Sequence, residues 1–340
     1  MGKKVLITGI LGMDGSHLAD FLLEKGYEIY GIVRRSSTRN TWRIEHIKDK
    51  IHLIYGDLTD QSSLDRAIKE SNPDEIYNLA AQSFVGSSWI HPEQTNNVNY
   101  LGNIRILESI RKINPKIKFY QASSSEIYGK VQEIPQNEKT QHYPRSPYGV
   151  SKLSAHWNTI VYRESFDIFA CSGILFNHSG IRRGIEFVTR KITDGVARIK
   201  LGLSKELVLG NLNAKRDIGN SKDYVRAMYL MMQQEKPETF IIATGKTYSI
   251  REIVEFAFEN AGMKITWEGD GLYEVGKVDD KIVVRVSEEF YRPNEVDLLI
   301  GNSTKAREKL GWIPEYDLPM TITEMVEEDL KRLKEGRIEL

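Results

Sequence analysis

The chain alternates short apolar runs with longer segments of helical periodicity, and this alternation constrains its fold more than any other feature. The apolar runs are rich in β-branched and aromatic residues, as buried strands are, and the segments between them repeat apolar residues every three or four positions, as helices do. In chain order the elements are KVLITG, 13–25, EIYGIV, IHLIYGD, 62–71, EIYNLAA, 95–113, IKFYQAS, 146–166 and FACSGILF. The pattern predicts an α/β fold with a Rossmann-type, doubly wound parallel sheet, which binds ligands at the carboxyl ends of its strands.

The alternation becomes less regular after residue 178, which indicates a second structural unit. Later elements are predicted as helices over 187–201 and 320–334 and a strand at TFIIATG. We therefore expect a cofactor-binding domain over 1–178, to which strands from 214–247 return. The remainder of 179–340 is expected to form a smaller substrate-binding lobe.

Composition limits the classes of partner. The 47 basic and 47 acidic residues give a formal net charge of zero, which argues against nucleic acid and against an anionic membrane surface. No apolar run approaches the roughly 20 residues that a membrane-spanning helix needs. The single cysteine, Cys171, lies in an apolar run, so a reducing, cytoplasmic location is expected. The seven histidines show no metal-ligand spacing, and we predict no metal site.

A glycine-rich loop follows the first predicted strand. Gly9, Gly12 and Gly15 stand in a G-x-x-G-x-x-G spacing that differs from the G-x-G-x-x-G fingerprint of dinucleotide-binding proteins. Glycines at this point allow a tight turn and let backbone amides approach a diphosphate at the helix N-terminus. With Met13 and Asp14 between them, they form the predicted diphosphate-binding loop of a dinucleotide cofactor.

The end of the second predicted strand bears on cofactor choice. An acidic residue there selects a free ribose hydroxyl, whereas a basic residue accommodates a 2′-phosphate. The chain has Arg34 and Arg35 at this place, so NADP is expected rather than NAD; the alternative is a solvated basic turn. Further predicted cofactor contacts are Asp57 and Leu58 after the third strand, and Leu79, Ala80, Ala81 and Ser83 after the fourth.

A tyrosine and a lysine stand one helical turn apart in YPRSPYGVSKL. Ser146 and Pro147 are typical of a helix start, so Tyr148 and Lys152 are expected to share one face of that helix. A neighbouring ammonium favours the phenolate, so we expect Lys152 to lower the pKa of Tyr148, which would then act as a base, and to reach a nicotinamide ribose. The alternative is a chance pair on an exposed helix face.

A glutamate ends the strand-like stretch FYQASSSEIYG. If this loop overhangs a nucleotide cofactor, the Glu126 carboxylate is a candidate acid–base group. Two structural roles remain open, namely capping of the following turn and pairing with a surface lysine.

At this point the chain resembles the extended short-chain dehydrogenases/reductases and, within them, the GDP-mannose 4,6-dehydratase family. The resemblance covers nearly the whole chain and depends on long motifs. Among them are RRSSTRNTWRIEH, YGDLTDQSSL, PDEIYNLAAQS, SSSEIYGKVQEIPQ, YPRSPYGVSKL, RRGIEFVTRKI, LGNLNAKRD, IATGKTYSIREIV, FYRPNEVDLLIG and KLGWIP.

The resemblance implies a reaction that uses Glu126. Tyr148 would remove the proton from the sugar 4-hydroxyl as hydride leaves C4, and Ser124 would hydrogen-bond the same oxygen. The C4 ketone acidifies the C5 hydrogen, so Glu126 would take the C5 proton and assist loss of the C6 hydroxyl as water. The family usually carries threonine where this chain has Ser124, which keeps the hydroxyl.

The resemblance also implies contacts to a GDP-sugar. The implied substrate residues are Ser83, Ser124, Glu126, Asn177, Val188, Lys191, Leu209, Gly210, Asn211, Arg216, Arg292 and Glu295. Arginine suits diphosphate because its guanidinium forms two parallel hydrogen bonds. In the family the RRSSTRN loop reaches a neighbouring subunit, which implies a homotetramer or a dimer.

Two segments depart from the family pattern. The chain reads FNHSGIRRG and RDIGN where FNHESPRRG and RDWGH are usual. Other substrates therefore stay open, such as a GDP-heptose or another nucleotide hexose. A 4-epimerase or 4-ketosugar reductase on the same fold is a further alternative, as is a protein that senses NADP without catalysis.

Overall fold

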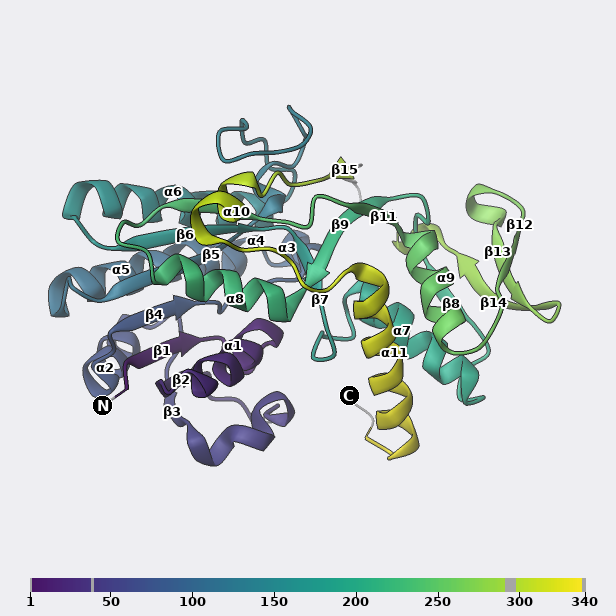
Figure 1. Cartoon of the computed structure of the whole chain (residues 1–340), viewed down its shortest axis with the longest axis horizontal. Coiled ribbons are helices and arrows are strands. Elements are labelled where there is room, and N and C mark those ends of the chain that lie inside the picture. Colours follow the sequence, from purple (N-terminus) through teal and green to yellow (C-terminus); the bar gives the residue numbers. More distant parts are fainter. Residues whose placement is uncertain (1, 38–39, 291–297, 338–340) are drawn as a thin grey trace.

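The computed structural model describes residues 2–37, 40–290 and 298–337. Its centre is a seven-stranded sheet in the order β10-β6-β5-β4-β1-β2-β3, and every pairing in it is parallel. Figure 1 shows the sheet beside a smaller unit built from the second half of the chain. The strands of the sheet are β1 (Lys4–Thr8), β2 (Glu28–Val33), β3 (His52–Tyr55), β4 (Glu75–Asn78), β5 (Lys118–Ser124), β6 (Ala170–Leu175) and β10 (Thr239–Ile242).

Helices cover both faces of this sheet because successive strand residues point to opposite sides. On β1, Val5 and Ile7 pack in one core with residues of α1 and α8, whereas Leu6 packs in another core with residues of α2 and α5. The fold is therefore doubly wound, as the sequence predicts. The helices of this unit are α1 (Met13–Glu24), α2 (Gln61–Ser71), α3 (Val85–Ile90), α4 (Pro92–Asn96), α5 (Gly102–Ile113), α6 (Pro147–Phe166), α8 (Ser221–Met232) and α10 (Thr304–Leu310), with the 3-10 segments η1 (Trp42–Lys50) and η3 (Ser125–Ile127).

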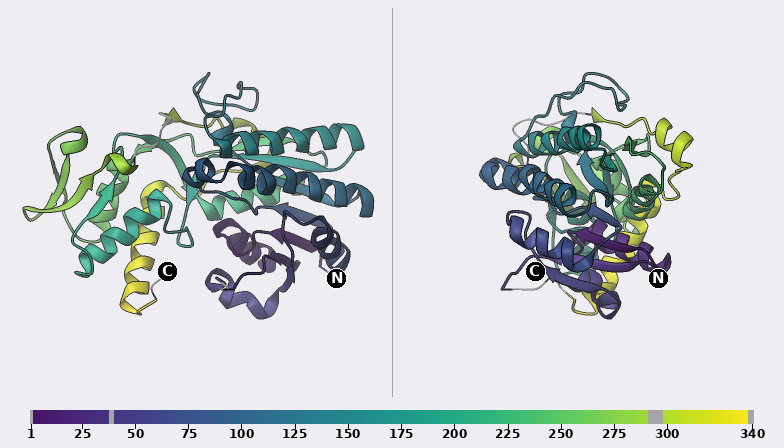
Figure 2. Two further views of the ribbon diagram at one scale, coloured as in Figure 1. Left: turned by 180° about the vertical axis from the view of Figure 1, so that it is seen from behind. Right: turned by 90° about the vertical axis from the view of Figure 1, so that its left-hand side faces the viewer.

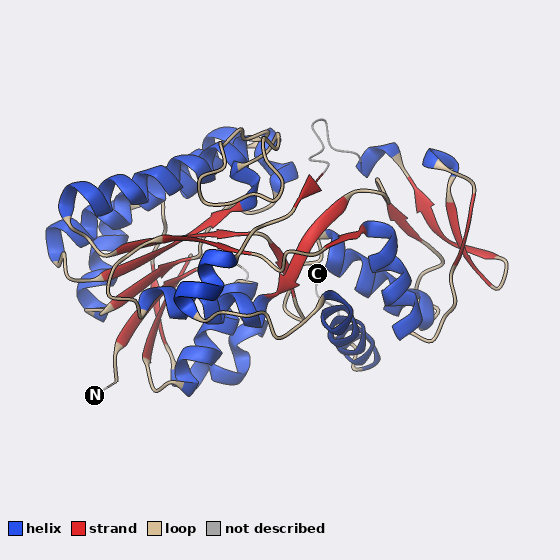
Figure 3. Ribbon diagram, turned by 45° about the horizontal axis from the view of Figure 1, so that its top comes forward, coloured by secondary structure: helices blue, strands red, loops and turns tan. Residues whose placement is uncertain are grey.

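The smaller unit contains two further sheets and three helices (Figures 2 and 3). In one sheet β9 (Lys215–Asn220) pairs with β11 (Thr247–Ser249), β15 (Leu298–Leu299) and β7 (Asn177–Ser179). The other sheet joins β12 (Thr266–Glu268), β13 (Val275–Val278), β14 (Lys281–Val286) and β8 (Leu207–Leu209). The helices are α7 (Val188–Lys200), α9 (Ile250–Asn260) and α11 (Leu318–Lys334), with the 3-10 turns η4 (Gly271–Tyr273) and η5 (Glu288–Phe290). Within 214–247, β10 joins the main sheet and β9 does not.

Helix boundaries agree with the sequence where a local cap sets them. The Ser146 side chain accepts a hydrogen bond from the Gly149 amide at 3.0 Å, and Pro147 occupies the first turn of α6. The segment 95–113, expected as one helix, is instead divided by a π-helical turn over Asn97–Leu101. Its wider turn carries the buried Asn99, whose amide donates to the Gln82 carbonyl at 3.0 Å and to Ser151 Oγ at 3.0 Å. The π-helical turn is therefore accompanied by hydrogen bonds from Asn99 to residues that are distant in sequence. The apolar periodicity of the sequence alone did not predict this turn.

In the described ranges, no helix combines the length and apolar character required to cross a bilayer. Within the same ranges, no group of three or more His, Cys, Asp or Glu side chains could hold a metal ion.

Candidate active site

The carboxyl ends of the central strands lie on the side of the sheet that faces the smaller unit (Figures 1 and 3), and the predicted cofactor and catalytic residues follow several of these strands. The glycine loop follows β1, and the segment with Leu79 and Ala80 follows β4. Ser124 ends β5, and Tyr148 begins the helix α6 beside it. Parallel strands place these distant segments at one edge of the sheet, as the sequence predicts.

The glycine loop packs tightly against the neighbouring strand. Gly9 has φ +74, and a Cβ atom there would lie 2.7 Å from the Ala80 amide nitrogen. A Cβ atom on Gly15 would lie 2.2 Å from the Gly9 carbonyl oxygen. The two glycines are therefore required by the turn itself, independently of any ligand.

Gly12 has a different place in the loop, at the N-cap of α1, where no side chain caps the helix. A Cβ atom there would meet only the Gly9 carbonyl oxygen, at 3.1 Å. The helix N-terminus is thus left open on its outer side, where a helix favours negative charge. This arrangement fits the diphosphate of a dinucleotide cofactor.

The other predicted cofactor residues differ in their hydrogen bonds and in their burial. The amides of Leu79 and Ala80 donate to Thr8 Oγ1 at 3.1 and 3.0 Å, which fixes them against the end of β1. Asp57 accepts from the Thr59 amide at 2.8 Å with Oδ1. Met13 and Leu58 are buried, Asp14 and Ala81 are half-buried, and Ser83, Arg34 and Arg35 are exposed.

Tyr148 and Lys152 lie on one face of α6, as expected, but their electrostatics differ from the sequence prediction. Burial raises the pKa of Tyr148 to about 12, and burial lowers the pKa of Lys152 to about 8. The lysine ammonium donates to the Ala122 carbonyl at 2.9 Å, and it lies 5.8 Å from the centre of the tyrosine ring. The pKa of Tyr148 is therefore raised in this structure and not lowered as the sequence predicted, because burial has the largest effect on it.

Two other groups favour the ionised form of Tyr148. The Ser124 hydroxyl hydrogen-bonds the phenol, and the positive charge of Arg183 acts in the same direction on the tyrosine pKa. Arg183 is a residue to which the sequence assigned no role. Its guanidinium carbon lies 3.6 Å from the centre of the Phe187 ring, so the charged group is held over an aromatic face. Nothing in the RRG sequence distinguishes this arginine from a surface residue.

Glu126 is half-buried and lies in η3, directly after β5. Its backbone amide donates to Ser124 Oγ at 3.3 Å, so Ser124 provides the cap of this turn. The Glu126 charge contributes to the raised pKa of Tyr148, after the larger effect of burial. The Glu126 carboxylate and the Ser124 hydroxyl therefore both affect the ionisation of the Tyr148 phenol.

His178 is a second residue that the sequence analysis did not assign to the site. Its Nε2 atom lies 2.9 Å from Asp14 Oδ2, and its Nδ1 atom lies 2.9 Å from the Phe176 carbonyl oxygen. The ring also stacks on Tyr224, with centroids 4.3 Å apart. Burial opposes ionisation of Asp14, but the charge and hydrogen bond of His178 outweigh it and the pKa of Asp14 is lowered.

The implied substrate residues are distributed over the smaller unit. Val188 begins α7, and Lys191 follows on the same turn with its Nζ atom 3.3 Å from the centre of the Phe290 ring. The residues Leu209, Gly210 and Asn211 follow one another at the end of β8, Asn177 begins β7, and Arg216 lies in β9. Arg292 and Glu295 lie outside the described residues.

The two segments that depart from the family pattern meet in the structure. In the ladder of β7 and β9, Ser179 is the direct partner of Asn220. Both side chains are buried: Ser179 Oγ bonds Thr189 Oγ1 at 2.7 Å, and Asn220 Oδ1 caps α8 by accepting from the Lys222 amide at 2.9 Å. Ser179 and Asn220, one residue from each departing segment, thus meet at an internal position between the two strands.

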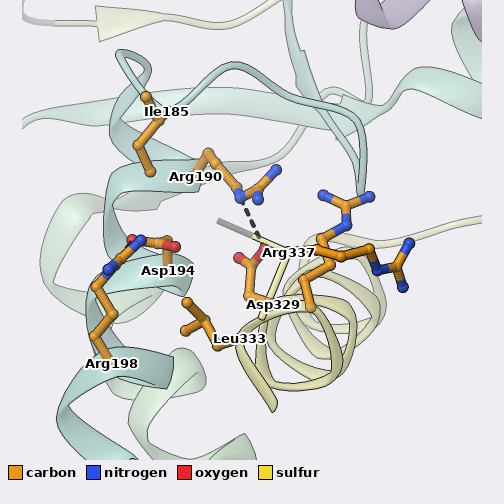
Figure 4. Close-up of a pocket in the computed structure, with 8 residues that line it drawn as sticks. Ile185, Arg190, Asp194, Arg198, Asp329, Leu333 and Arg337 are labelled. Atoms are coloured by element: carbon orange, nitrogen blue, oxygen red, sulfur yellow. Dashed lines mark hydrogen bonds and ion pairs between the residues drawn. The ribbon is translucent and has the colours of Figure 1, made fainter. Parts of the chain in front are cut away.

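A separate small pocket lies between α7 and α11 (Figure 4). It contains none of the predicted site residues. Its charged groups are paired, with 2.8 Å between Arg190 Nε and Asp329 Oδ1. The lining residues are Ile185, Arg190, Asp194, Arg198, Asp329, Arg332, Leu333 and Arg337.

The fold and site together define an enzyme of the extended short-chain dehydrogenase/reductase class. A family model described as GDP-mannose 4,6 dehydratase matches residues 6–325, and the chain belongs to this family. The chain is 51% identical to a GDP-mannose 4,6-dehydratase of Yersinia enterocolitica, over 98% of this chain and 95% of that protein. It is also 51% identical to the human GDP-mannose 4,6 dehydratase, over 98% of this chain and 94% of that protein.

Solved structures agree in fold. A UDP-glucose 4-epimerase from Thermotoga maritima, solved with UDP-glucose, aligns with a TM-score of 0.82 and 26% identity, over 97% of this chain and 99% of that chain. A dTDP-glucose 4,6-dehydratase from Bacillus anthracis, solved in complex with NAD, aligns with a TM-score of 0.81 and 23% identity, over 98% of each chain. At this identity the second likeness concerns the fold alone.

Proposed function

We propose that the chain converts GDP-mannose to GDP-4-keto-6-deoxymannose, with NADP as its cofactor. The observation that carries this proposal is the group formed by Tyr148, Ser124 and Glu126 at the carboxyl end of β5. Oxidation, reduction or epimerisation at C4 alone has no need of a carboxylate at C5, whereas elimination of water does. Membership of the GDP-mannose 4,6-dehydratase family supports the same reaction.

In the first step Tyr148 removes the proton from the sugar 4-hydroxyl. A bound nicotinamide would supply the hydride acceptor for C4 and the hydride donor for C6. Ser124 hydrogen-bonds the phenol and is placed to bond the same sugar oxygen. The charge of Arg183 favours the phenolate and offsets part of the effect of burial.

In the second step Glu126 removes the C5 proton, which the C4 ketone has made acidic, and protonates the departing C6 hydroxyl. Because that proton departs with the water, the carboxylate then takes a second proton from solvent and gives it to C5. Its place on η3, directly after the strand that carries Ser124, supports this role because one sugar ring could contact both side chains. Lys152, bonded to the Ala122 carbonyl, is proposed to position the nicotinamide ribose.

NADP is favoured over NAD by the basic residues after β2. Arg34 and Arg35 are exposed, and among the described residues neither forms an ion pair with an acidic side chain. Both are available to a ribose 2′-phosphate. The open N-terminus of α1 at Gly12 supports diphosphate binding. The remaining contacts are proposed for Gly9, Met13, Asp14, Gly15, Asp57, Leu58, Leu79, Ala80, Ala81 and Ser83.

We propose that residues 1–178 and β10 form the cofactor domain and that most of 179–340 binds the GDP-sugar. The Nζ atom of Lys191 lies 3.3 Å from the centre of the Phe290 ring, and a basic group beside an aromatic ring supports a nucleotide site there. The proposed contacts are Ser83, Ser124, Glu126, Asn177, Val188, Lys191, Leu209, Gly210, Asn211, Arg216, Arg292 and Glu295.

A homotetramer or dimer is proposed as the assembly. The helix α6 exposes Val150, Trp157 and Val161, which are 46%, 50% and 50% exposed. Their spacing of seven and four residues places them on one face of the helix. An exposed apolar face of this kind supports self-association. The single, buried Cys171 supports a cytoplasmic location.

The test is incubation with GDP-mannose in deuterated water and a trace of NADP, followed by mass and proton spectra of the product. Loss of one water, one deuterium at C5 and no accumulation of NADPH are expected. A product of unchanged mass would indicate a 4-epimerase, and consumption of added NADPH would indicate a reductase. If GDP-mannose is unchanged while another nucleotide sugar is dehydrated, the proposed dehydration mechanism is retained and GDP-mannose is rejected as the substrate.

A further inference from the structure

A row of buried hydroxyl and amide side chains runs across three neighbouring strands of the central sheet. Thr8 ends β1, Asn78 ends β4 and Gln121 lies in β5. These residues are 0%, 2% and 2% exposed. Strands that are covered on both faces are usually apolar, because burying an amide is costly unless it is hydrogen-bonded. We call Thr8, Asn78 and Gln121 the polar row.

The polar row is continuous and ends at the active-site lysine. Thr8 Oγ1 donates to Asn78 Oδ1 at 2.7 Å, and Asn78 Nδ2 donates to Gln121 Oε1 at 2.8 Å. Gln121 Nε2 then donates to the Ala122 carbonyl at 2.9 Å. The same carbonyl accepts from Lys152 Nζ at 2.9 Å. Gln121 and the lysine ammonium therefore bind one and the same oxygen atom.

The hydroxyl of Thr8 fixes the direction of these bonds. Its oxygen accepts from two backbone amides of the segment after β4 at 3.1 and 3.0 Å, which uses both lone pairs and leaves one hydrogen to donate. That hydrogen requires the oxygen of the Asn78 amide, so the nitrogen of Asn78 faces Gln121 and requires an oxygen in turn. The nitrogen of Gln121 is therefore left facing the Ala122 carbonyl, where only a donor can bind.

A second amide holds the oxygen of Gln121. Asn103 of α5 donates through Nδ2 to Gln121 Oε1 at 2.8 Å and to Thr159 Oγ1 at 3.1 Å. Its Oδ1 atom accepts from Asn158 Nδ2 at 2.8 Å. Two donors thus meet the same oxygen of Gln121, which agrees with the orientation that Thr8 dictates. The Gln121 amide cannot turn over without breaking its bonds to Asn103, to Asn78 and to the Ala122 carbonyl.

The Lys152 ammonium depends on that carbonyl for its direction. Burial lowers the pKa of Lys152 to about 8, so at pH 7 most of the side chain is an ammonium with three hydrogens to donate. Within the described parts of the chain, the Ala122 carbonyl is its one hydrogen-bond partner. The bond to this carbonyl and the position of Cε together fix where the two remaining hydrogens point. The ribose hydroxyls of a nicotinamide nucleotide can accept them.

The bond from Gln121 to Ala122 contributes little to the fold itself. It joins neighbouring residues of one strand, so it connects no separate elements. An apolar side chain at position 121 would also avoid the desolvation of an amide. What the bond restrains is the carbonyl to which Lys152 binds.

We propose that Gln121 is a positioning residue, which fixes the Ala122 carbonyl and through it the direction in which Lys152 presents its ammonium to the nicotinamide ribose. Gln121 acts through Lys152 and does not touch the cofactor or the reacting atoms. The inference rests on the proposed cofactor and on the proposed role of Lys152.

The test compares the binding of two ligands to the full-length protein at pH 7, by calorimetric titration. NADP carries the nicotinamide ribose, whereas adenosine 2′,5′-bisphosphate has only the adenosine half of NADP and offers Lys152 no ribose of this kind. Gln121→Met keeps the length of the side chain and removes its donor. We expect the Kd for NADP to rise about tenfold, as for the loss of one hydrogen bond to a charged group, and the Kd for the bisphosphate to stay within error. No change in either Kd, or an equal rise in both, would overturn the proposal.

Asn103→Leu is the matched control. It breaks a buried hydrogen bond to the same side chain and leaves the bond from Gln121 to the Ala122 carbonyl in place. It is expected to lower the Tm and to leave both Kd values unchanged. If it raised the Kd for NADP as much as Gln121→Met does, any disturbance of the polar row would have the same effect, and the positioning role would be rejected.

A double variant shows whether Gln121 acts through Lys152. Lys152→Met removes the ammonium, so adding Gln121→Met to it is expected to raise the Kd for NADP no further. The alternative route runs through Thr8, which binds the amides of Leu79 and Ala80 beside the proposed cofactor site. A further rise in the double variant would show that this route operates and would contradict the proposal.

A second variant keeps the test independent of folding, because Gln121→Met leaves the Asn78 amide without its acceptor. Asn78→Leu/Gln121→Met removes both amides together and so avoids an unpaired buried donor. The same selective rise in the Kd for NADP is expected, and equal changes for the two ligands would again overturn the proposal.

These titrations contain no sugar nucleotide, so they are independent of the proposed reaction. If the selective effect on NADP is found in a protein that does not dehydrate GDP-mannose, the positioning role of Gln121 is retained and the proposed reaction is rejected. If GDP-mannose is dehydrated but Gln121→Met binds both ligands as the parent protein does, the proposed reaction is retained and the positioning role is rejected.

Discussion

The Nε2 atom of His178 lies 2.9 Å from Oδ2 of Asp14, and this contact joins β7 to the first turn of α1. The other ring nitrogen of His178 faces the Phe176 carbonyl oxygen, which only accepts hydrogen bonds. The pKa of Asp14 is lowered although burial opposes its ionisation, and the contact with His178 contributes to that lowering. The start of β7, where Asn177 lies, is thereby fixed to the helix that follows the glycine loop.

Replacing Asp14 by asparagine is expected to destabilise the protein. The asparagine side chain loses the charge-assisted hydrogen bond to His178, and an interaction of this kind contributes about 1.5–3 kcal/mol. We expect the free energy of unfolding at pH 7 to fall by about this amount, which denaturant unfolding measures. Glu24→Gln, at the exposed end of the same helix, serves as the control, and an equal free energy of unfolding in the two variants would contradict the prediction.

Glu126→Gln is expected to separate the two chemical steps. Removal of the carboxylate leaves Tyr148 and Ser124 able to oxidise C4 but leaves no base for the C5 proton. In a single turnover with stoichiometric NADP we expect reduced nicotinamide to accumulate, while the rate of dehydration falls by about 10²–10⁴. Absorbance of the reduced ring and mass spectra of the sugar nucleotide measure the two effects. Glu164→Gln, an exposed carboxylate on α6, is expected to behave as the parent protein.

Lys152→Met is expected to raise stability at neutral pH while it removes activity. Burial depresses the pKa of Lys152 to about 8 from 10.5, so the unfolded chain binds more protons between these values. The free energy of unfolding therefore rises as pH increases from about 8 to 10.5, and below pH 8 the buried charge costs up to about 3 kcal/mol.

Methionine avoids this cost, although it loses the bond to the Ala122 carbonyl. Denaturant unfolding at pH 7 and pH 10.5 measures the difference. A stability gain that does not shrink between pH 7 and pH 10.5 would show that packing, rather than the lysine charge, is responsible. Lys112→Met, on an exposed position of α5, is the control for a change in charge.

Replacing Arg34 and Arg35 by serine is expected to change cofactor preference. The guanidinium groups are proposed to contact the 2′-phosphate, which NAD lacks. The Kd for NADP should rise by about tenfold or more for each lost contact, on the basis of about 1.5–3 kcal/mol for a hydrogen bond to a charged group, and the Kd for NAD should stay within error. Titration with both cofactors measures this. An equal change in the Kd for NAD and the Kd for NADP would indicate that the two arginines form a solvated basic turn and do not contact the 2′-phosphate.

Much of the fold is contained in local sequence. KVLITG and the runs like it form strands because β-branched residues fit the extended backbone, and Ser146 with Pro147 begins α6 as predicted. The same local patterns place Ser124, Tyr148 and the glycine loop at the carboxyl edge of a parallel sheet. These parts were predictable because each depends on neighbours along the chain.

Other features depend on contacts between segments that are distant in sequence. The partnership of Ser179 with Asn220 follows from the pairing of β7 with β9, which no local pattern indicates. The Arg182 carbonyl likewise accepts a hydrogen bond from Arg43 Nε at 2.7 Å, a contact that joins two segments far apart in the chain.

The sequence by itself therefore determined the order of strands and helices, the glycine loop and the choice of candidate reacting side chains. Only the tertiary structure decided their electrostatics. Burial raises the pKa of Tyr148 to about 12 and lowers the pKa of Lys152 to about 8, the reverse of what their spacing on one helix face suggests. The physical reason is that desolvation depends on everything packed around a group, whereas spacing reports only its neighbours along the chain.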